Sequence, residues 1–239
     1  MTYIDPTEVH ADVERAIERQ EYEGGSESVC DVLQAVAPAS SEYWYEVACE
    51  LHRRQKFYES LDCWREAEKY LAASDEEPRY WYQDMIATLI NAADQSGDSY
   101  FRHQALEACQ RLITLDASEE ALNYKLALMS DLNPDRDEIL SLIEEIFDNG
   151  FALKTDIKPW ALGVDNVDFI ERYSDLAECY LWLDRPADAM RVWSKAIDKN
   201  KHDAKDLLSG AIFMLNWYAD SRGFEDNSFL PEEFCRAAK

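Results

Sequence analysis

The sequence is short of basic residues and of glycine. Only 24 Lys and Arg stand against 49 Asp and Glu, so the formal net charge is −25, and glycine occurs 7 times in 239 residues. This acidic excess repels phosphate groups, which argues against nucleic acid or an anionic membrane as a direct partner and favours a basic one. A role in solubility alone would also explain the acidity, and the sequence leaves both explanations open.

Targeting and membrane segments are missing from the chain as printed. The opening MTYIDPTEVHADVE is acidic and has neither the basic nor the apolar region of a signal peptide. The longest apolar run, near LLSGAIFMLNWYA, is too short to span a bilayer. The six cysteines lie in apolar helical contexts without CxxC pairs, which favours a reducing compartment and cysteines that pack as core residues. We therefore expect a soluble, unsecreted, cytoplasmic protein.

Signatures of catalysis and metal binding are missing as well. The four histidines lie on different predicted elements, and no GxSxG, glycine-rich phosphate loop, HExxH or Cys–His pairing occurs. Neighbouring acids such as Glu144 and Glu145 are interpreted as part of a solvated acidic face, because general acid–base catalysis needs carboxylates that converge in a desolvated cleft. The expectation is a non-enzymatic protein with no cofactor and no metal.

The sequence does contain a repeated pattern of two amphipathic helices joined by a short turn. Counted from Tyr173, small and large apolar residues recur at fixed steps on both sides of the turn LDRP, and the same steps counted from Trp44 fall on both sides of HRRQK. The first set is Leu176, Ala177, Tyr180, Ala189, Trp193 and Ala196, and the second is Val47, Ala48, Leu51, Ser60, Trp64 and Ala67. Small residues are expected where the two helices approach closely, and large ones where a neighbouring pair packs.

Two further copies are less regular. One starts at Asn123, with turn LNPDRD, and places Leu126, Ala127, Ser130, Ile139, Ile143 and Ile146 at these steps. The other starts at Gln83 with Ile86, Ala87 and Ile90, but its second half, Ala105, Cys109 and Leu112, comes six positions late. We attribute the delay to a turn lengthened by the loop-like segment DQSGDSYF.

The pattern resembles the tetratricopeptide repeat (TPR), whose signature is W-x2-LG-x2-Y, then A-x3-F, then A, with a period of about 34 residues. The copy at Tyr173 matches well, whereas Ser60 and Ile139 replace the small alanine and Ser130 replaces the tyrosine elsewhere. The resemblance covers roughly residues 41–201. It implies an all-α, right-handed α-α hairpin solenoid with capping helices.

The remaining segments are expected to complete one domain over residues 1–239. Asp5, Pro6 and Glu8 predict the start of a helix, and Gly24-Gly25 separates it from a second helix that Pro38 ends, so residues 1–38 form an N-terminal pair. Residues 202–239 supply capping helices that cover the last repeat, ending with a short helix at PEEFCRAA. The segment 150–166 contains Phe151, Ile157, Trp160 and Leu162 and is expected to pack down, although a functional role stays open.

Binding is the function that this scaffold suggests. In TPR-like solenoids the first helix of each pair lines the concave face, and acids and aromatics alternate at the positions outside the predicted core. Carboxylates and rings together favour a peptide that carries Lys or Arg. We expect a scaffold that binds a basic peptide or protein; an immunity or inhibitor protein that neutralises a basic enzyme, such as a nuclease toxin, is the alternative. The predicted partner-binding residues are Glu42, Tyr45, Glu46, Trp81, Asp84, Met85, Asn91, Tyr124, Lys125, Glu171, Asp175, Glu178 and Trp182.

Overall fold

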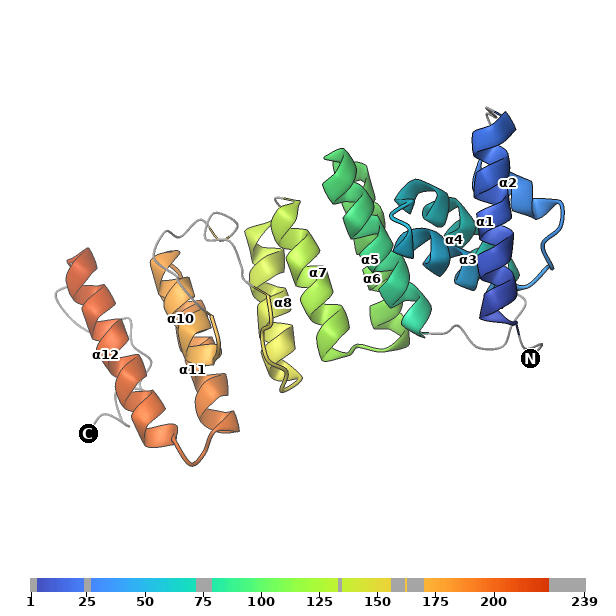
Figure 1. Cartoon of the computed structure of the whole chain (residues 1–239). Coiled ribbons are helices and arrows are strands. Elements are labelled where there is room, and N and C mark those ends of the chain that lie inside the picture. The colour runs from blue at the N-terminus through green and yellow to red at the C-terminus, as the bar shows by residue number, and fades with distance from the viewer. Residues whose placement is uncertain are drawn as a thin grey trace. The chain divides into compact units, whose positions relative to one another are not determined.

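The computed structural model describes residues 4–23, 27–71, 79–132, 135–155, 162 and 170–223, and all regular structure in this part is α-helical (Figure 1). The all-α prediction is confirmed for these residues. Contacts between residues divide the chain into two compact units, Met1–Ala121 and Leu122–Lys239. The expectation of one domain over the whole chain stays a prediction.

Helices of unit 1 pack as consecutive hairpins. Contacts join α1 to α2, α3 to α4 and α5 to α6, and α4 and α5 link the second hairpin to the third. The helices are α1 (Pro6–Glu23), α2 (Val29–Gln34), α3 (Ser41–Arg53), α4 (Phe57–Leu71), α5 (Arg79–Ser96) and α6 (Ser99–Leu115). The next helix, α7 (Glu119–Asp131), begins at the end of unit 1 and continues into unit 2.

Short polar side chains begin several of these helices. The Asp5 carboxylate accepts the amide of Thr7 at 2.9 Å, as expected for a helix that starts at Pro6. Ser28 and Asp31 form a reciprocal capping box at α2, and Ser40 caps α3. Each cap satisfies a backbone N–H that has no partner inside its own helix.

Three helix C-termini share one backbone geometry. Gln55, Gly150 and Asp184 each follow a helix in the left-handed region, with φ of 60°, 75° and 63°. At each turn the left-handed residue and its successor donate their amides back to the last turn of the helix; Lys56, for example, donates to the Leu51 carbonyl at 2.9 Å. This is the Schellman arrangement that closes a helix C-terminus.

The first repeat packs as the sequence predicts. All of its predicted core residues, from Val47 to Ala67, are buried, and Trp44 and Trp64 are each 1% exposed. Ser60 stands where the repeat signature has alanine, and its hydroxyl donates to the Ala48 carbonyl at 2.7 Å across the hairpin. Serine is therefore compatible with close helix approach, because its only polar group is satisfied.

The second repeat differs from the prediction in two ways. Its first helix buries Tyr82, Ile86 and Leu89, whereas Ala87 and Ile90 are half-buried, so the pattern starts one residue before Gln83. The expected loop DQSGDSYF is not a loop. α5 runs to Ser96 and α6 starts at Ser99, and only two residues, a left-handed glycine and the N-cap Asp98, separate them. Longer helices, rather than a longer turn, delay the second half of this repeat.

Unit 2 contains α8 (Arg136–Asp148), α10 (Tyr173–Trp182), α11 (Pro186–Lys199) and α12 (Ala204–Arg222). α10 and α11 form the hairpin predicted around LDRP, and α12 contacts both of them, as expected for a covering helix. The predicted core of this hairpin is buried throughout. In the copy counted from Asn123, Ala127 is half-buried, while the other five positions are buried.

Parts of three predictions fall outside the described residues. These parts are Gly24-Gly25, Ile157 and Trp160 of the segment 150–166, and the C-terminal helix at PEEFCRAA. Within the described part of 150–166, Leu162 is buried at 1% exposure and Phe151 is half-buried.

Candidate partner-binding surfaces

The predicted partner-binding residues come from α3, α5, α7 and α10, except Glu171, which lies two residues before α10. The structure brings some of them together at two places, the α3–α5 cleft in unit 1 and the α10 surface in unit 2. Of the two predicted residues on α7, Tyr124 and Lys125, both are half-buried.

The α3–α5 cleft has a volume of about 270 Å³ and lies between the first helices of two consecutive hairpins. Its floor includes Trp64 of α4, and its walls are Cys49, His52 and Arg53 of α3 and Asp84, Ala87 and Thr88 of α5. Asp84 is exposed, so the cleft presents an acidic side chain to solvent.

Aromatic rings form one side of this region. Tyr45 is stacked on Trp81 with 5.1 Å between ring centroids and an interplanar angle of 9°, and it meets Trp64 edge-on at 5.3 Å. Trp81 is only 3% exposed, so its ring packs between helices and offers little surface to a partner. Tyr45 is half-buried.

Asp84 is held in place by hydrogen bonds rather than by an ion pair with any cation of the described ranges. The Tyr45 hydroxyl donates to Asp84 Oδ2 at 2.7 Å, and Cys49 Sγ lies 4.0 Å from the same oxygen. No Lys or Arg of the described ranges forms an ion pair with Asp84, nor with Glu42 or Glu46 on α3. Carboxylates that lack an intramolecular cation are available to an external one.

Polar side chains at the far end of the cleft bond to one another. Thr88 donates its hydroxyl to the Asp84 carbonyl at 2.8 Å and therefore accepts from His52 Nδ1, also at 2.8 Å. This assigns the hydrogen of His52 to Nδ1 and leaves Nε2 to accept from Asn91, whose amide nitrogen lies 3.5 Å away. His52, which lines the cleft, is thus held by hydrogen bonds to Thr88 and Asn91.

The chemistry of the cleft does not favour nucleophilic catalysis. Burial, with smaller contributions from Asp84 and Glu46, raises the pKa of Cys49 to about 12, so the sulfur stays a neutral thiol at neutral pH. A thiol is a poor nucleophile compared with a thiolate. Burial and the bond to Asp84 likewise raise the pKa of Tyr45 far above its ordinary value.

Met85 lies elsewhere. It lines a separate cleft of about 120 Å³ between α4, α5 and α6, together with Leu61, Glu68 and Arg111. The second helices of two hairpins supply most of that lining, so Met85 does not share the α3–α5 cleft with Asp84.

On the α10 surface, the three predicted carboxylates differ in environment. Glu171 is exposed, whereas Asp175 accepts the backbone amides of Glu171 and Arg172 at 2.9 and 3.1 Å and so fixes the start of α10. Glu178 is half-buried, and burial raises its pKa, with Asp175 adding to the effect. Of these three carboxylates, Asp175 has a structural role that the sequence did not predict.

Trp182, the last predicted residue, is 40% exposed and touches Trp217 of α12 edge-on, with 5.0 Å between ring centroids. Trp217 was not among the predicted binding residues. Its spacing from the buried Ala211 and Leu215 places it on another side of α12, and that signal was present in the sequence.

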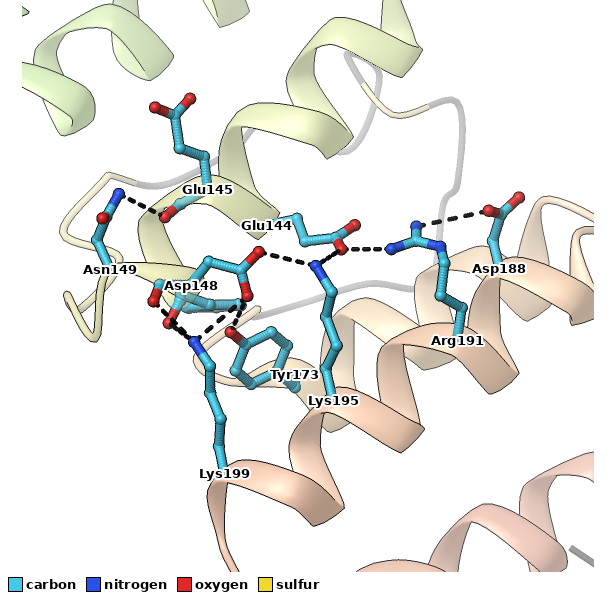
Figure 2. Close-up of polar contacts among 10 residues, drawn as sticks. Glu144, Glu145, Asp148, Asn149, Tyr173, Asp188, Arg191, Lys195 and Lys199 are labelled. Carbon is cyan, nitrogen blue, oxygen red and sulfur yellow. Dashed lines mark hydrogen bonds and ion pairs between the residues drawn. The ribbon is translucent and has the colours of Figure 1, made fainter. Parts of the chain in front are cut away.

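A second feature missed from the sequence is an ion-pair network between α8 and α11 (Figure 2). Glu144 is 8% exposed and bonds to Arg191 and Lys195, so its interpretation as a solvated acid was wrong. Asp148 binds Lys195 at 2.8 Å and Lys199 at 3.3 Å. The four-residue spacing of acids on α8 and of bases on α11 was the available signal.

This network contributes to packing. Glu145, next to Glu144, is exposed and points away from it in Figure 2. Burial alone would raise the pKa of Glu144, but the hydrogen bonds from Arg191 and Lys195 outweigh that effect and lower it. The pKa of Asp148 is lowered in the same way, so cations of α11 keep both Glu144 and Asp148 ionised.

The described ranges hold no group of three or more His, Cys, Asp or Glu side chains placed to bind a metal ion. None of the helices in those ranges combines the length and apolarity needed to cross a bilayer. Five cysteines, Cys30, Cys49, Cys63, Cys109 and Cys179, are free thiols, and all except the half-buried Cys49 are buried.

Known proteins give no further guide to the site. No model of a protein family matches the chain, and a search of curated proteins found no match.

Proposed function

We propose that the chain is a non-enzymatic protein-binding module, a TPR-like right-handed solenoid whose first helices hold a basic segment of a partner protein. The confirmed hairpins and their shared left-handed turns support the repeat architecture. The acidic excess supports the partner's charge: if every Lys and Arg neutralised one carboxylate, 25 carboxylates would still be left over. A basic partner would reduce this self-repulsion.

The observation that carries the proposal is the position of Asp84. Its carboxylate is exposed at a cleft that Trp64 also lines, and it is oriented by the Tyr45 hydroxyl at 2.7 Å. An oriented carboxylate beside ring surface suits a Lys or Arg side chain, because the carboxylate pairs with the charge and the rings contact the methylene stem. Arg53, on the opposite wall, already bonds to Glu50.

The test begins with a partner that co-purifies with the full chain and continues with binding kinetics over a salt series. Association should slow steeply as salt rises beyond about 0.1 M, where the Debye length is about 10 Å. Asp84→Asn should slow association, and Tyr45→Phe, which removes only the bond that orients Asp84, should have a smaller effect in the same direction.

The matched control is Glu145→Gln, which removes the same charge from an exposed position in the other unit. Equal association rates for wild type, Asp84→Asn and the control would contradict a role for the cleft. An association rate that ignores salt would contradict a basic partner altogether.

The same experiment separates the scaffold from the inhibitor role. If the partner is an enzyme whose activity falls stoichiometrically on binding, the acidic side chains occupy a cationic site and the chain is an inhibitor or immunity protein. If the partner stays active, or has no activity, the scaffold role stands.

A further inference from the structure

Three aromatic side chains remain exposed together on α10 and α12 in unit 2. Trp182 and Trp217 are each 40% exposed and touch edge-on, and Phe213, one helical turn before Trp217, is 68% exposed. Single exposed apolar residues are common on protein surfaces, but adjacent large ones indicate an interaction site. Without a partner, this group of rings leaves apolar area in contact with water.

Next to these rings on α10 is a carboxylate that forms no ion pair with the described residues. Glu178 is one turn before Trp182 on α10, so both side chains lie on the same side of the helix. Glu178 is half-buried, and it makes no ion pair within the described ranges. Its nearest described cation in sequence, Arg172, pairs with Asp175 instead, at 3.4 Å.

Glu178 differs in this respect from the acids of the α8–α11 network, the buried Glu144 and the exposed Asp148. Glu144 and Asp148 are each bonded to two cationic side chains of α11. Burial raises the pKa of Glu178, whereas the pKa values of Glu144 and Asp148 are lowered by their cationic partners. A partly desolvated carboxylate that lacks a cation costs stability, so its presence indicates a use outside folding.

We propose that the α10–α12 surface, defined as Glu178, Trp182, Phe213 and Trp217, binds a helical segment of a partner protein in which a lysine or arginine is followed one turn later by a large apolar side chain. This inference rests on the proposed function and names the partner's chemistry at one surface. The cation would pair with Glu178 beside the Trp182 ring, and the apolar side chain would cover Trp217 and Phe213.

Charge decides between a basic partner and a second copy of the chain. In a symmetric dimer the same patch meets itself, which would bring two Glu178 carboxylates toward each other. Like charges are unfavourable in such a contact, and a net charge of −25 on each copy adds to the repulsion. A basic segment has neither cost.

The experiment uses the full chain and short capped helical peptides that lack tryptophan. The probe peptide repeats Lys and Leu one turn apart along one face; one control replaces each Lys by Glu, and the other replaces each Leu by Ser. Binding is followed by tryptophan fluorescence at low and high salt. The Lys/Leu peptide should bind at least about tenfold more tightly than either control, and its affinity should fall with salt.

Two variants locate the peptide. Glu178→Gln, which keeps the side-chain shape, and Trp217→Ala should each weaken binding of the Lys/Leu peptide about tenfold, with unchanged helicity by circular dichroism. Glu145→Gln should bind as the wild type does. Glu178→Gln alone decides the outcome if Trp217→Ala fails to fold.

Each contrary outcome has a different meaning. Salt-sensitive binding that neither variant weakens overturns the α10–α12 surface but leaves the proposed function standing. If the Glu-containing peptide binds as tightly as the Lys/Leu peptide, or neither binds, both proposals fail. A dimer in sedimentation that Trp217→Ala dissociates overturns this proposal in favour of a second copy.

Discussion

The helix contact between α3 and α5 in unit 1 and the contact between α8 and α11 in unit 2 are held by different forces. At the first, Tyr45 packs on Trp81 and Trp64. At the second, Glu144 and Asp148 bond to three cationic side chains of α11 (Figure 2). Ring packing is nearly insensitive to salt and pH, whereas ion pairs depend on both.

The difference shows which residues a hairpin of this type requires. Both units keep small buried residues at the close approach within a hairpin, such as Ala48 with Ser60 in unit 1, and Ala177 and Ala189 in unit 2. Contacts between hairpins are free to be aromatic or ionic, because the spacing there is set by larger side chains.

The largest expected effect comes from breaking the aromatic contact. Trp64 is 1% exposed, touches the Tyr45 and Trp81 rings, and lines clefts on both sides of the hairpin. Trp64→Ala should lower the free energy of unfolding by about 3–5 kcal/mol, measured by urea denaturation, with little dependence on salt. Tyr22→Ala, at a ring that is 93% exposed, is the control and should change stability by less than about 0.5 kcal/mol. A similar small loss for both variants would mean that Trp64 is not part of a packed core.

A smaller effect is expected at the ionic contact. Glu144→Gln should destabilise the protein by about 1–2 kcal/mol at low salt, because two charge-assisted hydrogen bonds are weakened while Arg191 and Lys195 can still be solvated. The loss should shrink at high salt. Glu145→Gln changes the neighbouring exposed charge and should have almost no effect, so equal losses for the two variants would show that the network contributes nothing.

The α8–α11 contact should also be more sensitive to acid than the α3–α5 contact. The pKa values of Glu144 and Asp148 lie below their ordinary values of 4.5 and 3.8. Burial would raise both pKa values, but hydrogen bonds outweigh it. The donors are Arg191 and Lys195 at Glu144, and Lys195, Tyr173 and Lys199 at Asp148. Their contribution is therefore complete above those ordinary values and is lost as pH falls through the lowered ones.

Amide hydrogen exchange provides the local measurement for this comparison. Protection of α11 should decrease below about pH 4, and it should do so less in a Glu144→Gln/Asp148→Asn variant, which has no such carboxylates to protonate. Protection of α5 beside Trp81 should be the reference. Equal acid sensitivity of α11 in the variant and the wild type would contradict the pKa shifts.

The smallest effect concerns the shared turns. Gln55 is exposed and adopts a φ of 60°, which glycine tolerates without strain, so Gln55→Gly should stabilise the protein by about 0.5–1 kcal/mol. Asp184 has the same backbone conformation, but its carboxylate accepts the Tyr218 hydroxyl and pairs with Arg222 at 3.4 Å. Asp184→Gly should therefore give no gain in thermal melting. A gain at Asp184 and none at Gln55 would contradict this explanation.

Much of the fold could be predicted from periodicity, since the first and last indexed repeats place every predicted core residue in the interior. The prediction of a loop at DQSGDSYF in the second repeat was wrong, because only Gly97 and Asp98 of this segment form a turn and the longer helices α5 and α6 include the rest. A turn's residue types are visible in sequence, but how far the helices extend toward it depends on packing.

The candidate surfaces were less predictable. Position on a first helix placed Asp84 and Glu178 outside the predicted core, and neither is buried. It did not show that Trp81 is buried or that Met85 lines a different cleft. A shift of one residue in the start of the repeat is enough to rotate each side chain by about 100°, and so to change which neighbour it meets.

The sequence by itself determined the acidic charge, the all-α class and the hairpin positions, because charge is a property of composition and helical periodicity is local along the chain. The tertiary structure alone decided which carboxylates are neutralised. Glu144 and Glu178 look alike in sequence, yet one is bonded to Arg191 and Lys195 from α11, and the other lies beside Trp182 without a described cation. Pairing depends on side chains that are distant in sequence and meet only when the helices pack.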